Sequence, residues 1–120
     1  MEQHTLFAIY LGSNDIYVVN YLNNNKTANE NINNIIQTMF MKIEDICKVG
    51  GRNFLILNIS PLDLAPVNAN NKYQNYEYLI PYFNNMINNS SQILFNKYSD
   101  INIIIYDTIT EFKFIMNKYR

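Results

Sequence analysis

Three short apolar runs predict the β-strands of this chain. They cover residues 6–11, 54–59 and 101–106 of the 120-residue sequence. The last run is rich in isoleucine, a β-branched residue that favours strands. Continuous apolar runs, without regular alternation of polar residues, are typical of strands that lie buried in a parallel sheet.

The segment between the first two runs carries the pattern of an amphipathic helix. Its apolar residues recur at steps of three and four and therefore fall on one helix face. These residues are Ile32, Ile35, Ile36, Met39, Phe40, Ile43, Ile46 and Cys47. Gly50 and Gly51 follow, and we expect them to end the helix because glycine adopts the left-handed conformation of a C-terminal cap without strain.

Two further helices are predicted in the second half of the chain. One spans about residues 81–98 and begins with Pro81, since proline suits the first helical turn. The other follows Asp107, which together with Thr108 forms a polar pair suited to cap a helix. Its apolar face is made of Phe112, Ile115 and Met116.

Strands that alternate with helices of this length predict parallel β-α-β units with right-handed crossovers. The expected fold class is therefore α/β, with a parallel sheet in a three-layer α/β/α arrangement. Residues 60–80 form one long connection, rich in Pro, Asn and Tyr. It is either the wall of a site or a surface loop packed by Tyr73, Tyr76 and Tyr78.

Candidate chemistry follows the first strand. Gly12 stops the apolar run, and Asn14 and Asp15 come two and three residues later. The carboxyl ends of the strands are where open α/β sheets build their sites. Gly12 permits a sharp turn, and the Asn14 amide is a donor that can hold an oxyanion during acyl transfer. We expect Asp15 to hold Asn14 in place; alternatively, Asn-Asp is ordinary turn chemistry.

The block formed by Gly12, Ser13, Asn14 and Asp15 resembles the third conserved block, Gly-x-Asn-Asp, of the GDSL or SGNH esterase family. Residues 50–62 are similar to the family's next strand and its proline-containing exit loop. Residues 82–87 and 101–107 look like its later helix and its last strand. These matches come in the family's order and cover most of the chain, and fungal carbohydrate esterases and plant GDSL lipases are the members that it resembles.

The resemblance implies a flavodoxin-like sheet of five strands, of which residues 1–120 supply the last three as one partial SGNH hydrolase domain. It implies that Asn14 is an oxyanion-hole donor and that Gly12 and Asp15 belong to the supporting loop. It also implies a serine nucleophile and a histidine base. The family places its Gly-Asp-Ser block upstream of Gly12, where this sequence has no serine, and its Asp-x-x-His block after the last strand, whereas the only histidine is His4.

The implied function is hydrolysis of a carboxylic ester, with an acylated sugar or a short-chain lipid ester as the substrate of the completed domain. The 120 residues alone are expected to be inactive, because Ser13 has no base near it in sequence. Two alternatives stay open: a truncated, non-catalytic relative that binds an acyl or sugar ligand, and an unrelated flavodoxin-like binding module. The second predicts a nucleotide or anion site, yet no glycine-rich phosphate loop is present.

Length, charge and composition narrow the possible functions and partners of the chain. The length fits one domain, and the net charge of -1 gives no reason to expect nucleic acid as a partner. No apolar run approaches the roughly 20 residues of a membrane span, and residues 1–11 lack the features of a signal peptide, although the resemblance implies secretion. Cys47 is the only cysteine, so we expect no disulfide framework and no cysteine-based metal site. We also expect no cofactor. The 22 asparagines are attributed to an A/T-rich codon bias.

Overall fold

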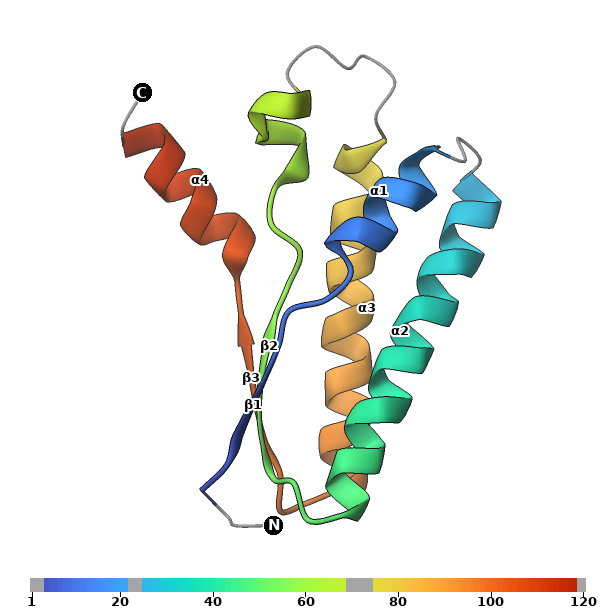
Figure 1. Ribbon diagram of the computed structural model, residues 1–120, viewed down its shortest axis with the longest axis vertical. Helices are drawn as coiled ribbons and strands as arrows, with labels where there is room; N and C mark the ends of the chain where they lie inside the picture. The colour runs from blue at the N-terminus through green and yellow to red at the C-terminus, as the bar shows by residue number, and fades with distance from the viewer. Residues whose placement is uncertain (1–3, 22–24, 69–74, 119–120) are drawn as a thin grey trace.

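The computed structural model describes residues 4–21, 25–68 and 75–118. In this part of the chain, strands alternate with helices (Figure 1). The strands are β1 (Leu6–Ile9), β2 (Asn53–Leu57) and β3 (Asn102–Tyr106). The α-helices are α1 (Ser13–Tyr21), α2 (Asn25–Lys48), α3 (Tyr76–Lys97) and α4 (Thr108–Lys118). Two short 3₁₀ helices, η1 (Leu62–Leu64) and η2 (Pro66–Asn68), follow β2.

The three strands form one open parallel sheet in the order β1-β2-β3. Its register aligns Phe7 with Phe54 and Phe54 with Ile103. These side chains and those two residues further along point to the same face, because successive side chains of a strand alternate between faces. Phe54 and Ile56 on this face are buried. The predicted α/β class with a parallel sheet is confirmed.

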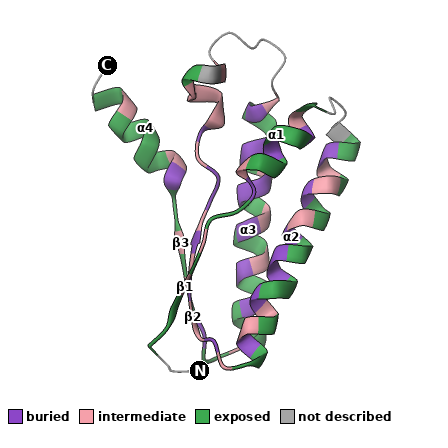
Figure 2. Cartoon of the chain, viewed as in Figure 1, coloured by how far each residue is buried: buried purple, intermediate pink, exposed green. Residues whose placement is uncertain are grey.

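The hydrophobic core lies between this face of the sheet and the helices α2 and α3 (Figure 2). All eight residues of the predicted apolar stripe of α2 are buried or half-buried, and Cys47 is only 2% exposed. The helix ends as predicted. The Gly51 N–H donates to the Ile46 carbonyl at 2.8 Å and the Gly50 N–H to the Cys47 carbonyl at 3.0 Å, while Gly50 has a φ of 98°. This is a Schellman cap, which satisfies carbonyls that the helix leaves unpaired.

The boundaries of two helices differ from the prediction. Helix α3 begins at Tyr76, so Pro81 lies inside the helix rather than in its first turn. Tyr76 and Leu79 are buried in the core, and this burial outweighs the hydrogen bond that an interior proline removes. Tyr76 and Tyr78 therefore belong to α3 and not to a surface loop, while Tyr73 lies outside the described residues. Helix α2 begins at Asn25, before its predicted stripe, and α1 was not predicted as a separate helix.

The other face of the sheet is largely uncovered. Helices α1, α2 and α3 all lie on one side, whereas α4 lies on the opposite side and points away from the strands (Figures 1 and 2). Leu6, Ile104 and Tyr106 on this second face are 55%, 60% and 45% exposed. The strands were predicted to be buried, and they are buried on one side only. The strand order never reverses, so right-handed crossovers place every connecting helix on the same face.

Helix α4 leaves its own apolar face open as well. Phe112 is 48% and Ile115 43% exposed, while Thr108 at the start of the helix is buried. The predicted apolar stripe is therefore present, but within the described residues the sheet does not cover it. With α4 on the second side, the arrangement is compatible with three α/β/α layers of a flavodoxin-like fold.

Candidate functional site

The site begins with Gly12, which joins β1 to α1 in a turn that excludes larger residues. Its φ is 110°, a conformation that side chains with a Cβ rarely adopt. A Cβ at this position would collide with the ring of Phe83 in α3 and lie 3.1 Å from the Ile59 side chain. The Gly12 carbonyl accepts the Ile16 N–H at 2.8 Å, and this bond starts α1. The sharp turn predicted at Gly12 is therefore present.

Asn14 is the second residue of α1 and is exposed at the carboxyl edge of the sheet. Neither its side chain nor that of Asp15 has a hydrogen-bond partner among the described residues. The Asn14 amide is thus available to a ligand, and the first-turn N–H groups around it carry the positive end of the helix dipole. Because no hydrogen bond of Asp15 orients Asn14 in the described part of the chain, its supporting role stays a prediction.

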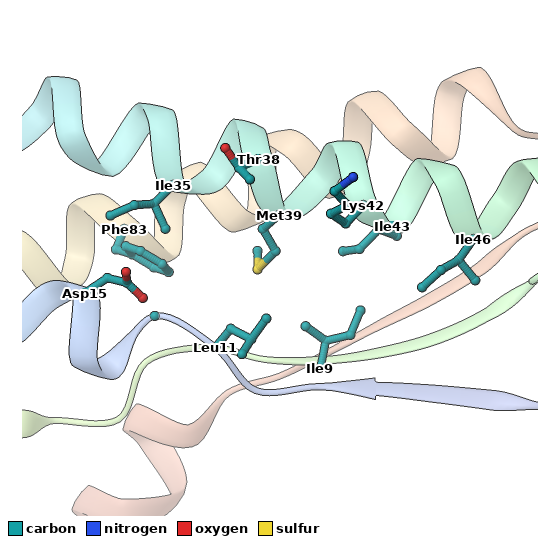
Figure 3. A pocket seen from close by; sticks show the side chains of 11 residues that line it. Ile9, Leu11, Asp15, Ile35, Thr38, Met39, Lys42, Ile43, Ile46 and Phe83 are labelled. Carbon is teal, nitrogen blue, oxygen red and sulfur yellow. The ribbon is translucent and has the colours of Figure 1, made fainter.

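An apolar cavity of about 360 Å³ adjoins this turn. It lies between the end of β1 and helix α2, and Figure 3 shows Leu11 and Ile9 on one side with Met39 and Ile43 on the other. Asp15 and Gly12 line its end at the start of α1, and Lys42 and Thr38 add polar atoms from α2. Asn14, between Gly12 and Asp15 in sequence, is not among the residues that line the cavity. Cavities of roughly 300–1,000 Å³ hold small ligands, and an apolar lining favours an apolar group.

A hydroxyl pair links the exits of the first two strands. The Tyr10 and Ser60 hydroxyls lie 2.8 Å apart, although the two residues are 50 positions apart in sequence. Ser60 has no histidine near it, because His4 lies before β1 at the opposite end of the sheet (Figure 1). This serine therefore lacks the base that would activate it as a nucleophile. The sequence analysis did not find this pair.

Two buried asparagines fix the exit of β2 and were also missed. The Asn84 amide accepts the Ile59 N–H at 2.8 Å and donates to the Ile59 carbonyl at 3.1 Å. Asn58 accepts the Thr108 N–H at 2.8 Å, which ties β2 to the start of α4. Each residue interrupts an apolar pattern: Asn58 lies inside the run 54–59, and Asn84 occupies the buried stripe of α3. A polar residue at such a position was the available signal, and it was attributed to codon bias.

Asp107 caps α4, as its position after the last strand predicted. Its carboxylate accepts the Thr110 hydroxyl at 2.6 Å and the Thr110 N–H at 3.3 Å. The Asn58 amide donates to the same carboxylate at 3.3 Å. These hydrogen bonds, led by that of the Thr110 hydroxyl, hold the pKa of Asp107 below its ordinary value although burial opposes them. Asp107 is therefore an anion at neutral pH.

No family model and no curated protein matches this chain. Within residues 4–21, 25–68 and 75–118, no group of three or more His, Cys, Asp or Glu side chains could hold a metal ion. The same part of the chain contains no helix that is both long and apolar enough to cross a membrane.

Proposed function

We propose that residues 1–120 form the oxyanion-binding part of a carboxylic ester hydrolase of the GDSL or SGNH type. The observation that supports this proposal is the position of Asn14. Its amide is exposed and unpaired among the described residues, it follows the sharp turn at Gly12, and it lies at the carboxyl edge of a parallel sheet. These are the surroundings that the resemblance of residues 12–15 to the Gly-x-Asn-Asp block implies.

In this proposal the Asn14 side chain acts on the transition state. Attack on an ester carbonyl converts its oxygen into an oxyanion, and the Asn14 Nδ2 group donates a hydrogen bond to that oxygen. Removing one such donor from an acyl-transfer enzyme costs roughly 3–4 kcal/mol of transition-state stabilisation. The positive end of the α1 dipole acts in the same direction.

The apolar cavity beside Gly12 suits the acyl group of the ester. Most of its lining is apolar and includes Ile9, Leu11, Met39 and Ile43, whose side chains offer no hydrogen bond. A short acyl chain placed there would leave its carbonyl near the start of α1. This arrangement supports an acyl ester as the substrate and leaves the alcohol part, sugar or lipid, undefined.

The serine and the histidine would have to come from outside these 120 residues. His4 is the only histidine of the sequence and lies at the far end of the sheet from Asn14. Among the described residues, neither Ser13 nor Ser60 is hydrogen-bonded to a histidine. Residues 1–120 alone are therefore expected to bind an ester or its product without turning it over.

A binding module without catalysis is the second candidate. The apolar cavity together with the lack of a serine–histidine pair in the described residues favours it. Sequencing the transcript upstream and downstream of the region that encodes residues 1–120 distinguishes the two candidates. An upstream Gly-Asp-Ser and a downstream Asp-x-x-His support the hydrolase, whereas stop codons at both ends support the binding module.

Hydrolysis of p-nitrophenyl acetate by the 120-residue chain tests the assignment of roles. We expect no turnover above that of a heat-treated sample. Saturable turnover that Ser13→Ala or Ser60→Ala abolishes would show that the chain carries its own nucleophile. That result would contradict the assignment of these residues to the oxyanion-binding part alone.

A further inference from the structure

A second cavity opens at the carboxyl end of β3, between α3 and the start of α4. Its volume is about 430 Å³. Six of the nine residues that line it are polar, whereas the cavity beside Gly12 is almost entirely apolar. The polar residues that line it are Asn58, Asn84, Asn85, Asn88, Asp107 and Thr110. The remainder of the lining is one proline and two isoleucines.

One wall of this cavity is fixed by internal hydrogen bonds. The side-chain carbonyl and amino groups of Asn84 both hydrogen-bond to the main chain of Ile59. Asn58 is hydrogen-bonded to Thr108 and Asp107. Asn58 and Asn84 are 9% and 7% exposed. Such a wall holds Asp107 and the neighbouring backbone in one geometry before any ligand arrives, which lowers the entropic cost of binding.

Two further asparagines of α3 offer unpaired amides to the cavity. Asn85 and Asn88 lie three residues apart on α3, so their side chains share one helix face. Both are exposed, and neither has a hydrogen-bond partner among the described residues. Each amide provides two N–H donors and one carbonyl acceptor. Together they can pair with groups that both donate and accept hydrogen bonds, as a hydroxyl does.

The charge of the cavity excludes several ligand classes. Among the described residues, Asp107 is the only charged one in the lining, and its lowered pKa keeps it ionised at neutral pH. Its carboxylate repels anions and accepts hydrogen bonds from hydroxyl groups. Among the described residues, no group of three or more His, Cys, Asp or Glu side chains could hold a metal ion, so nothing in this lining points to a bound cation. Ile105 and Ile109 add an apolar surface for C–H groups.

We propose that this cavity binds a neutral ligand with vicinal hydroxyl groups, that is, a simple sugar or another polyol. The ligand hydroxyls donate to Asp107 and exchange hydrogen bonds with Asn85 and Asn88, while the carbon skeleton lies against the isoleucines. The proposal does not depend on ester hydrolysis, because none of these residues belongs to the turn that carries Asn14.

Saturation-transfer NMR with the 120-residue chain tests the proposal, since this measurement tolerates self-association of the protein. Methyl β-D-glucopyranoside is the probe and glucose 6-phosphate the anionic comparison. We expect saturable transfer to the neutral glucoside with a dissociation constant on the order of 1 mM, and much weaker transfer to the phosphate. Absence of transfer to the glucoside at concentrations about tenfold higher would overturn the proposal.

Substitutions then locate the binding. The double variant Asn85→Leu/Asn88→Leu should weaken binding by about tenfold or more, whereas Asn89→Leu should not, because Asn89 is an exposed asparagine on the same helix that does not line the cavity. If the double variant does not fold by circular dichroism, Asn88→Leu alone replaces it. Asp107→Asn keeps a capping side chain, and it should reduce the discrimination against glucose 6-phosphate. Equal affinity in the Asn88 and Asn89 variants would place the ligand elsewhere and contradict the proposal.

Discussion

The side chain of Asn84 holds both polar groups of the Ile59 main chain, accepting its N–H at 2.8 Å and donating to its carbonyl at 3.1 Å. This pairing continues the hydrogen bonding of β2 beyond its last residue and attaches the strand exit to α3. Ile59 is fully buried and touches the position that a Cβ of Gly12 would occupy. Asn84 therefore positions Ile59, whose side chain lies beside the Gly12 turn of the candidate site.

Replacing Asn84 should destabilise the fold. Asn84→Leu leaves the buried N–H and carbonyl of Ile59 without partners, at about 1–3 kcal/mol for each group. We expect a loss of roughly 3 kcal/mol in the free energy of unfolding, measured by urea denaturation with circular dichroism. Asn89→Leu on the exposed side of the same helix is the control and should change stability by less than about 0.5 kcal/mol. Equal stability of the two variants would show that the Ile59 contacts contribute nothing.

Gly12→Ala should be more destabilising than the same substitution at the end of α2. Both Gly12 and Gly50 have positive φ angles, 110° and 98°, so both substitutions carry a conformational cost of about 1–3 kcal/mol. Only at Gly12 does the new methyl group also meet the ring of buried Phe83. Adding Phe83→Leu to Gly12→Ala should relieve part of this clash, which gives a favourable coupling in a double-mutant cycle of thermal unfolding. Strictly additive effects would exclude the predicted contact.

The 120-residue chain should associate through the uncovered face of its sheet. Open, flat apolar edges and faces of sheets recruit other chains. Ile104→Lys places a charge on this face and should raise the monomer fraction in size-exclusion chromatography with light scattering. Ile93→Lys is the matched control, because Ile93 is 68% exposed on α3, away from the sheet. An unmodified chain that elutes as a monodisperse monomer would refute the expectation.

Asp107 should make the fold sensitive to acid. Its pKa is lower in the folded chain than its ordinary value of 3.8, so folding stabilises the ionised form. This contribution is fully present above the pKa of the unfolded chain and is lost as the pH falls through the pKa of the folded chain. Asp107→Asn should therefore be less stable than the parent at neutral pH, with a difference that shrinks below about pH 4. A pH-independent difference in urea unfolding would assign the effect of Asp107 to packing instead.

Sequence patterns predicted the elements that depend on residues close together in the chain. The stripe of α2 repeats over a long helix, and the two glycines after it form the expected cap. Helix α1 lacks such a signal, because only Ile16 and Val19 are buried while Tyr17 and Val18 are exposed. Helix α3 starts early because Tyr76 is buried in the core. No residue next to Tyr76 in the sequence indicates this burial.

In the candidate site, too, some features could be predicted from local sequence and others could not. The turn at Gly12 and the cap at Asp107 follow from the preferences of single residues, and both are present. The Tyr10–Ser60 pair joins residues 50 positions apart, and the Asn84–Ile59 contacts span 25 positions. Such pairs depend on how strands and helices are brought together, and periodicity along the chain does not carry that information.

The proposed role of Asn14 is tested most directly by kinetics of a completed enzyme. In it, residues 1–120 are joined to a Gly-Asp-Ser strand of a GDSL esterase ahead of β1 and to an Asp-x-x-His segment after α4. We expect ester hydrolysis in which Asn14→Ala lowers kcat by roughly 10²–10³ with little change in KM, since the donor acts on the transition state. Asn89→Ala should leave both constants unchanged. An active, folded enzyme in which Asn14→Ala leaves kcat unaltered, or raises only KM, would contradict the assignment of Asn14 as the oxyanion donor.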